Sequence, residues 1–396
     1  MTDTTQVTGN INEGGATASS DTIETVFLCA GCQTDIDIAT KIAAYLKQAR
    51  KSIDISAYSF SLCPDTRDII LAVLRERATA GVQIRIAYDA GTQQSLMTVH
   101  NDPCDFTTAQ FVQSLGFPCK PIEGDRALMH HKYIILDGGT PQAQVWTGSM
   151  NFTDDSWQLQ ENNVIIFQSG ELAKYYLQDF DELWVDSHIL SSGIMDSGEA
   201  TLQYGGKPAY VLVNFSPSEG EWIDESIANL IDRTKEQISI ASVVITSTRI
   251  IKALLGAMER GVPIEGIYDW SQMEGVKYQW QLVPMNTWKI GAFARIVEYG
   301  KLVGKRSTPY TPTSTHDYMH NKVMVLDNAV LTGSYNFSRH AQKNAENALV
   351  IQSEALAQSY RDYVRKITSM YEAASPTFTR KPITPEEAPE APEIAR

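Results

Sequence analysis

Hydrophobic and polar positions follow the same succession twice along this chain. In the first half, a stretch with apolar residues three and four positions apart leads into the apolar run SIDISAYSFS at residues 52–61. In the second half, an equivalent stretch leads into QISIASVVIT at residues 237–246. Each pair predicts a helix that is followed by a buried strand. The apolar positions of the two helices are Ile42, Ala43, Tyr45 and Leu46, and Ile227, Ala228, Leu230 and Ile231.

A second pair of matching segments follows each strand. Residues 69–91 and 250–272 both show a helical pattern that ends at a Gly-Val pair and then a short strand that ends at Tyr-Asp. The glycines are Gly81 and Gly261, and the aspartates are Asp89 and Asp269, so both landmarks recur at the same offset. Alternating helices and strands predict an α/β sheet in each half, and the constant offset indicates an internal duplication.

The repeat divides the chain into parts. We expect a first α/β domain over residues 23–190, a linker over residues 191–208 and a second α/β domain over residues 209–375. Residues 1–22 are rich in Thr, Ser, Gly and Asn, and residues 376–396 are rich in Pro and Glu. Neither end has apolar periodicity, so both are predicted to be disordered.

Composition adds limits to this picture. The 396 residues are 43% hydrophobic and 20% charged, as in globular domains, and no apolar run approaches the length needed to span a bilayer. The start has neither the basic nor the apolar region of a secretory signal, so the expectation is a soluble, cytoplasmic protein. A net charge of −14 disfavours indiscriminate binding to nucleic acid, although it leaves a local basic groove open.

The cysteines do not form a recognisable framework. There are five, an odd number, and all lie in the first third of the chain. Cys29 and Cys32 form a CxxC sequence, but no second pair of ligands stands at a zinc-site spacing. We therefore interpret them as small buried or loop residues.

The candidate chemistry lies in a motif that occurs once in each half. MHHKYIILD and MHNKVMVLD share the spacing HxKxxxxD, and each is followed by a GSxN block, GSMN or GSYN. A Glu-Asn pair begins thirteen residues after each of the two motif glycines. The residues concerned are His130, Lys132, Asp137, Ser149, Asn151 and Glu161 in the first half, and His320, Lys322, Asp327, Ser334, Asn336 and Glu346 in the second.

The spacing has a physical consequence. In a strand, residues i and i+2 project to the same face, so each histidine and its lysine point the same way. With the Asn amide and the Ser hydroxyl they form an anion pocket that suits a phosphate. A glutamate that accepts a hydrogen bond from one imidazole nitrogen fixes the tautomer and raises the basicity of the other nitrogen. One imidazole can then attack phosphorus while the other protonates the leaving oxygen and later activates water, without a metal ion.

Duplicated HxKxxxxD and GSxN motifs resemble those of the phospholipase D superfamily, and the resemblance covers residues 23–375. It implies two phospholipase D-like α/β domains related by a pseudo-twofold axis, an active site at their interface and a phosphohistidine intermediate. It makes His130 and His320 the catalytic pair, with His130 as nucleophile by family analogy. Lys132, Lys322, Asn151 and Asn336 would hold phosphate, and Glu161 and Glu346 would orient the histidines. Asp137 and Asp327 would be supportive, although an Asp that ends a strand is often only a turn former.

The substrate stays open between two classes. A phospholipid at a membrane surface fits the acidic charge and a segment rich in aromatic residues and methionine that could meet an acyl chain. Nucleic acid fits the compact motifs, which resemble those of small bacterial nucleases as well as cardiolipin hydrolases. We favour phospholipid hydrolysis because the charge of −14 disfavours a groove that follows a phosphate backbone. The segment contains Trp270, Met273, Tyr278, Trp280, Met285 and Trp288.

An inactive binding or scaffold protein is the third alternative, and it is disfavoured because both motifs are intact. No cofactor or metal is implied, and no obligate protein partner. Because both motifs lie in one chain, a monomer is sufficient for catalysis.

Overall fold

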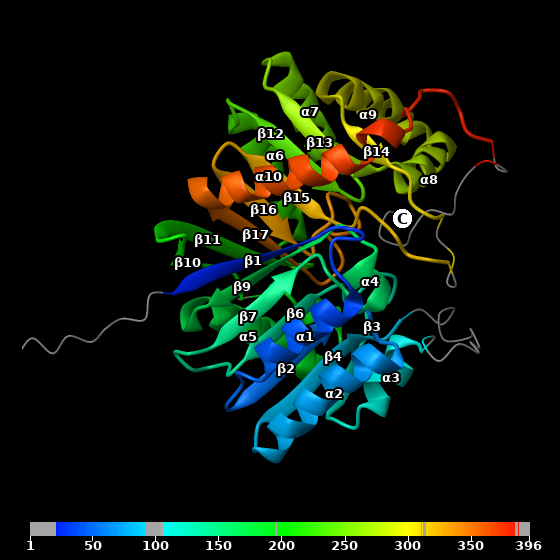
Figure 1. Ribbon diagram of the computed structural model, residues 1–396. Helices are drawn as coiled ribbons and strands as arrows, with labels where there is room; N and C mark the ends of the chain where they lie inside the picture. The colour runs from blue at the N-terminus through cyan, green and yellow to red at the C-terminus, as the bar shows by residue number, and fades with distance from the viewer. Residues whose placement is uncertain are drawn as a thin grey trace, which may run out of the picture.

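The computed structural model describes residues 21–91, 104, 106–194, 196–309, 311, 314–384 and 387 (Figure 1). The strands of the first half are β1 (Thr22–Leu28), β2 (Ser52–Ala57), β3 (Phe60–Ser61), β4 (Gln83–Asp89), β5 (Cys119–Ile122), β6 (Lys132–Leu136), β7 (Gln144–Gly148), β8 (Phe152–Thr153), β9 (Asn162–Gln168) and β10 (Gly198–Tyr204). Those of the second half are β11 (Lys207–Ser216), β12 (Ile238–Ser242), β13 (Ile264–Asp269), β14 (Val303–Lys305), β15 (Lys322–Leu326), β16 (Ala329–Gly333) and β17 (Glu346–Gln352).

Helices accompany these strands in both halves. The α-helices are α1 (Asp35–Leu46), α2 (Pro64–Thr79), α3 (Thr108–Ser114), α4 (Asp154–Gln158), α5 (Gly170–Asp186), α6 (Gly220–Arg233), α7 (Thr248–Glu259), α8 (Trp270–Leu282), α9 (Thr287–Gly300) and α10 (Glu354–Tyr371). Short 3₁₀ turns are η2 (Ile189–Ser191), η3 (Pro284–Asn286) and η4 (Glu372–Ala374).

One sheet of fifteen strands runs through both halves. Outward from the centre, the first half reads β9-β7-β6-β2-β4-β5 and the second reads β17-β16-β15-β12-β13-β14, which is the same order of equivalent strands. In each half the three outermost strands are parallel and the inner ones antiparallel. The predicted architecture of two similar α/β halves is therefore confirmed.

Two helices, α5 and α10, pack mainly against the strands of their own half. Apolar residues of α5 and α10 share one hydrophobic core with strands of both halves, whereas α1 and α2 cover the outer face of the first half and α6 and α7 that of the second (Figure 1). Ser169 and Ser353 cap α5 and α10 by accepting the backbone N–H of Leu172 and Leu356. Among the described residues, none of the helices combines the length and apolarity that a bilayer crossing requires.

The segment predicted as a linker belongs to the centre of the sheet. Within residues 191–208, β10 pairs with β11 and β1, and β11 begins at Lys207, before the expected domain boundary at 209. The reason is a short alternation in which Ala200 and Leu202 are buried between exposed neighbours. A Gly-Gly turn joins the two strands, and both glycines have positive φ angles.

The Pro/Glu-rich tail also departs from the expectation of disorder over its first part. Residues 376–384 run along α8, where Lys277 Nζ donates to the Thr379 carbonyl oxygen at 3.1 Å. The Phe378 side chain is 5% exposed and packs against Tyr268 and Phe293. A single aromatic side chain anchors a segment whose average composition is polar. Residues 388–396, and residues 1–20 of the predicted N-terminal disordered segment, lie outside the described residues.

The expectation for the cysteines is wrong for four of them. Cys29 is bonded to Cys32, and Cys63 is bonded to Cys104, which leaves Cys119 free. The loop after β1 brings Cys32 back to Cys29, with 5.3 Å between the Cα atoms, within the range for a disulfide. The second bond joins residues 41 positions apart, a proximity that sequence spacing does not disclose.

Candidate active site

The two catalytic motifs meet because each one hydrogen-bonds to the other half of the chain. The His130 backbone N–H donates to the Ala345 carbonyl oxygen at 2.9 Å, and the His320 N–H donates to the Glu161 carbonyl oxygen at 3.1 Å. Short parallel bridges join Met129 to Ala345 and Glu161 to Met319. These reciprocal contacts place the start of β6 and the start of β15 at the interface between the halves.

The lysines lie beside the histidines as the strand spacing predicted. Lys132 Nζ donates to the His130 carbonyl oxygen and Lys322 Nζ donates to the His320 carbonyl oxygen, both at 2.7 Å. Both lysines are 1% exposed. The sequence analysis missed Tyr58, whose ring centroid lies 4.9 Å from Lys132 Nζ and 4.7 Å from the His130 ring. Its position just after β2 carries no motif that could have identified it.

Burial and the charges of two lysines disfavour protonation of both imidazoles. Burial lowers the pKa of His130 well below its usual value, and the positive charges of Lys132 and Lys322 lower it further. The pKa of His320 is lowered for the same reasons, by burial first and then by both lysines. Each histidine responds to both lysines, so the four side chains form one electrostatic cluster.

The lysines themselves are poorly solvated. Burial lowers the pKa of Lys132 to about 7, although the Glu346 carboxylate acts in the opposite direction. Burial lowers the pKa of Lys322 well below its usual value, and the charge of Lys132 adds to this effect. Two buried ammonium groups that lower each other's stability in the charged form favour the binding of an anion beside them.

His130 is paired with a carboxylate from the other half. Its Nδ1 lies 2.7 Å from Glu346 Oε2, and both side chains are buried. The other carboxylate oxygen, Oε1, accepts from Asn344 Nδ2 at 3.1 Å. Burial raises the pKa of Glu346 to about 7, while Lys132 lowers it. A carboxylate at Nδ1 holds the ring in the tautomer that leaves Nε2 unprotonated, as a nucleophile requires.

His320 is paired with an amide instead. Its Nδ1 lies 3.0 Å from Asn162 Oδ1. Asn162 Nδ2 donates to the Ser156 carbonyl oxygen at 3.1 Å, which can only accept, so this bond fixes the orientation of the amide. Oδ1 therefore accepts a hydrogen bond from His320 Nδ1–H. His320 is oriented as firmly as His130, but without a negative charge.

Glu161, which the sequence spacing assigned to His320, has another partner. Its carboxylate accepts from Lys305 Nζ at 2.6 Å and from the Tyr371 hydroxyl, and its Oε1 accepts from the Ala30 N–H at 3.3 Å. These contacts do not support the prediction that the Glu161 carboxylate orients a histidine. Lys305 and Tyr371 hold it at the interface, where only its carbonyl oxygen contacts His320.

The error arises from one extra residue in the first half. Gly148 pairs with Val164, sixteen positions later, whereas Gly333 pairs with Ala348, fifteen positions later. The position equivalent to Glu346 is therefore Asn162. Counting from the glycine alone cannot detect this shift, but aligning the apolar strands NVIIF and NALVI would have done so.

The GSxN residues divide into two pairs with different surroundings. Asn336 is 1% exposed, and neither Oδ1 nor Nδ2 of its amide has a hydrogen-bond partner among the described residues; the same holds for Asn151 Oδ1. Buried polar atoms without partners indicate a place for a polar ligand. Ser149 and Ser334 instead bond the neighbouring strand, accepting the backbone N–H of Asn163 and Asn347 at 3.0 Å.

Asp137 and Asp327 lie away from this cluster, at the far ends of β6 and β15. Asp137 Oδ1 accepts three backbone N–H groups, from Arg50, Lys51 and Ser52, at 2.6–3.2 Å. Asp327 accepts the equivalent three, from Lys235, Glu236 and Gln237, at 2.9–3.1 Å. Both residues have positive φ angles. Their role in the catalytic set is not supported by these contacts, because they anchor the turn that precedes β2 or β12.

No group of three or more His, Cys, Asp or Glu side chains that could hold a metal ion occurs in the described part of the chain. The side chains gathered at the interface are imidazoles, lysines and amides. Two histidine-lysine motifs that meet between duplicated α/β halves define a protein of the phospholipase D-like class.

Comparison with known families gives the same result. The family model described as "Cardiolipin synthase, PLD-like domain" matches residues 42–184 and again residues 227–368, which together make up more than half of the chain. The chain therefore belongs to this family. Each of the two matches contains its own complete catalytic motif, so the duplication seen in the sequence is confirmed.

Curated relatives and solved structures agree with this assignment. The chain is 27% identical over 147 residues to a mitochondrial cardiolipin hydrolase of Xenopus tropicalis, covering 37% of this chain and 60% of that protein. It is 33% identical over 151 residues to a phospholipase D of Rickettsia felis, covering 37% and 63%. The chain thus spans somewhat over half the length of these relatives. The fold is similar to that of phosphatidylserine synthase of Haemophilus influenzae, with a TM-score of 0.59, 14% identity and coverage of 88% and 85%.

Proposed function

We propose that this protein hydrolyses a phospholipid phosphodiester through a phosphohistidine intermediate, with His130 as the nucleophile and His320 as the acid and base. The observation that carries the assignment of roles is the difference between the partners of the two histidines. His130 has the Glu346 carboxylate at Nδ1, and His320 has the neutral Asn162 amide. The ring that becomes positively charged when it bonds to phosphorus is best stabilised by the carboxylate.

In the first step, His130 Nε2 attacks phosphorus and the bond from phosphorus to the leaving oxygen breaks. The Nδ1–H of His130 remains hydrogen-bonded to Glu346, which balances the charge of the phosphorylated ring. His320 Nε2–H donates its proton to the leaving oxygen. Entry of the phosphodiester anion raises the pKa of His320 from its low value in the empty site, so that ring carries the required proton in the complex.

In the second step, neutral His320 removes a proton from water, and the resulting oxygen attacks phosphorus. The bond from phosphorus to His130 Nε2 breaks, and the phosphomonoester leaves. Lys132, Lys322 and the side chains of Asn151 and Asn336 surround the phosphate oxygens in both steps. All charges are balanced by these side chains, so turnover should continue in EDTA.

Three observations support a phospholipid over a nucleic acid. The family model and the curated relatives carry names that refer to cardiolipin and phospholipase D. The net charge is −14. The segment rich in aromatic residues divides between the core and the surface: Met273 and Trp280 are buried, whereas Met285, between α8 and α9, is 84% exposed and Trp288, in the first turn of α9, is 39% exposed. Both exposed side chains can meet a lipid surface.

The test compares the purified protein with its His130→Ala variant, both in EDTA. The substrates are phosphatidylcholine and cardiolipin vesicles, single- and double-stranded DNA, RNA, and bis-p-nitrophenyl phosphate. We expect the wild type to release phosphatidic acid or head group, and the variant to release none. Cleavage of nucleic acid alone would show a nuclease instead, and absence of turnover on every substrate would show a binding or scaffold protein.

Trapping the intermediate distinguishes the two histidines. Acid-quenched protein after a short incubation with radiolabelled substrate should give a phosphorylated peptide that contains His130. A label on the peptide that contains His320 would reverse the proposed roles.

A further inference from the structure

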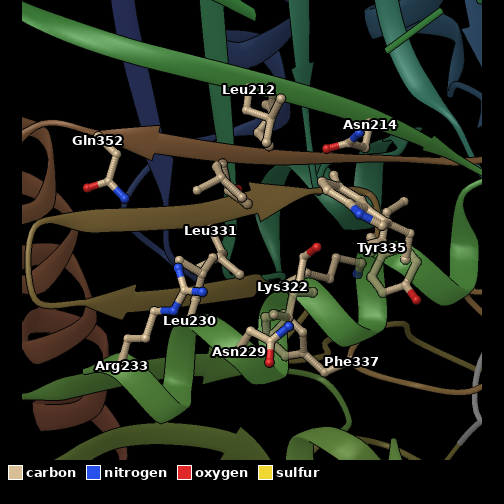
Figure 2. A pocket seen from close by; sticks show the side chains of 18 of the residues that line it. Leu212, Asn214, Asn229, Leu230, Arg233, Lys322, Leu331, Tyr335, Phe337 and Gln352 are labelled. Carbon is tan, nitrogen blue, oxygen red and sulfur yellow. The ribbon is translucent and has the colours of Figure 1, made fainter. Parts of the chain in front are cut away.

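A cavity of about 310 Å³ lies between α6 and the strands β11, β16 and β17 of the second half. Figure 2 shows the strands above it and α6 below, with Leu230 and Leu331 projecting into it. The volume is at the lower end of the range for small-molecule sites, about 300–1,000 Å³. Most of the residues around it are apolar. No step of the proposed mechanism uses it.

In the first half, larger side chains occupy the equivalent position. Strand pairing makes Trp146 the counterpart of Leu331 and Val164 the counterpart of Ala348. The helix repeat makes Tyr45 the counterpart of Leu230. In the first half, Tyr45 and Trp146 are buried with their ring centroids 5.4 Å apart. In the second half, all three positions carry smaller residues, and a cavity remains between helix and sheet.

The residues that line the cavity extend along both elements. They include Ala348, Val350 and Gln352 of β17 and residues of α6 from Trp222 to Arg233. Four residue steps along a strand correspond to about 14 Å. An unbranched apolar chain can follow this lining between helix and sheet.

One end of the cavity borders the catalytic cluster. Lys322 is part of its wall, and the ammonium group of the same residue contacts the His320 carbonyl oxygen. Tyr335, which stands between Ser334 and Asn336 of the GSxN block, lines it as well (Figure 2). The space and the phosphate pocket thus lie on two sides of the same residues. The distal end carries Arg233 and Gln352, which are exposed.

We propose that this cavity is a binding site for one fatty acyl chain of the lipid substrate. The inference rests on the proposed function, since it assigns to a tail of the same molecule a place next to the pocket that holds its phosphate. The apolar lining gains free energy with each methylene group that leaves water. Activity should therefore rise with the length of the acyl chain until the cavity is full.

The first arm of the test measures turnover on monomeric phosphatidylglycerols with butanoyl, hexanoyl or octanoyl chains. For the wild type we expect kcat/KM to rise at least about tenfold from butanoyl to octanoyl. In three variants of the second half, the larger residue type of the first half replaces its smaller counterpart: Ala348→Val, Leu230→Tyr and Leu331→Trp. They should reduce this rise to less than about threefold, while turnover of bis-p-nitrophenyl phosphate stays unchanged. Glu221→Tyr, at an exposed position of α6, is the matched control and should keep the full rise.

The second arm measures binding without turnover, by the fluorescence of cis-parinaric acid. The wild type and Glu221→Tyr should bind the probe, and the three filled variants should bind it at least about tenfold more weakly. Ala348→Val adds only two methyl groups, so it keeps the test valid if Leu331→Trp does not fold.

The outcomes separate this inference from the proposed function. Cleavage of phosphatidylglycerol that rises equally with chain length in folded, filled variants would overturn the acyl-chain site but not the phospholipase. Absence of lipid cleavage by the wild type would overturn the proposed function. In that case the cavity would not be a substrate subsite, even if it binds the fluorescent probe.

Discussion

Glu346 and Asn162 occupy equivalent positions, and they give the two histidines different chemical properties. A carboxylate stabilises a positively charged imidazole, whereas an amide orients the ring and leaves its charge uncompensated. Glu346→Gln should therefore lower kcat/KM by about 10³-fold, because the phosphorylated His130 ring loses its counter-charge. Steady-state kinetics on the lipid substrate measures this effect.

Glu161→Gln is the control for this prediction. It removes the same charge at the interface, but at a carboxylate that pairs with Lys305 and Tyr371. We expect kcat/KM to change by less than about threefold. A loss as large as that of Glu346→Gln would mean that Glu161 contributes to the chemistry after all.

The pH dependence follows from two groups that titrate in the same range. The pKa of Glu346 is raised to about 7, so the carboxylate takes up a proton as the pH falls below this value. The pKa of Lys132 is lowered to about 7, so the ammonium loses its proton as the pH rises above it. Both losses reduce activity, and kcat/KM should pass through a maximum near pH 7. A plot of log kcat/KM against pH measures it.

Lys132→Arg separates the two limbs of this profile. An arginine keeps its positive charge throughout the range, so the alkaline limb should move to higher pH while the acidic limb stays. The absolute rate falls because the guanidinium is larger. An unchanged alkaline limb would show that another group causes it.

At the scale of single elements, Asp137 and Asp327 hold the turns that begin β2 and β12. Asp137→Ala leaves three backbone N–H groups without their acceptor, so we expect the free energy of unfolding to fall by about 2 kcal/mol. The kcat should stay within about threefold of the wild type. Urea denaturation and turnover of bis-p-nitrophenyl phosphate measure the two quantities. A large loss of kcat in a variant of normal stability would restore the catalytic role.

The segment after α10 contains one buried aromatic side chain. Phe378 is 5% exposed and packs edge-on against Phe293, with ring centroids 4.9 Å apart. Phe378→Ala should lower the stability of the protein by about 3 kcal/mol, the lower end of the cost of such truncations. Thermal unfolding of the full chain measures this loss. A variant with the melting temperature of the wild type would show that residues 376–384 contribute nothing to the fold.

At the scale of the whole molecule, we expect each chain to contain a full active site, because both histidines come from the same chain. A mixture of His130→Ala and His320→Ala proteins should be inactive, because each chain lacks one of its two histidines and neither can supply the other. Turnover of the mixture, compared with each variant alone and with the wild type, measures this. Recovery of activity on mixing would indicate a site built between chains.

The sequence was sufficient for the architecture and for the residues with a repeated spacing. The pairs His130 with Lys132 and His320 with Lys322 lie as strand geometry requires, because each pair is defined within three residues. Contacts between residues that are far apart in the sequence were harder to predict. The shift from Glu161 to Asn162 depends on strand register, and the disulfide between Cys63 and Cys104 depends on how distant segments fold together.

Average composition was a poor guide where a few positions decide the outcome. Residues 198–204 contain Gly, Thr and Gln and look like a connector, yet Ala200 and Leu202 are enough to place them in the sheet. Phe378 has the same effect in a segment rich in proline and charge. In both cases the free energy comes from one or two buried side chains, which an average over twenty residues conceals.

Joining the two halves in one chain has a further consequence for what evolution can change. In a homodimer built from identical halves, symmetry would give both histidines the same partner, and a substitution in one copy would appear in the other. Here the gene encodes each half separately, so Glu346 and Asn162 can differ, as can Trp146 and Leu331. Each copy is free to specialise: Glu346 of the second half supplies a carboxylate to His130 of the first, and the second half has a cavity beside α6.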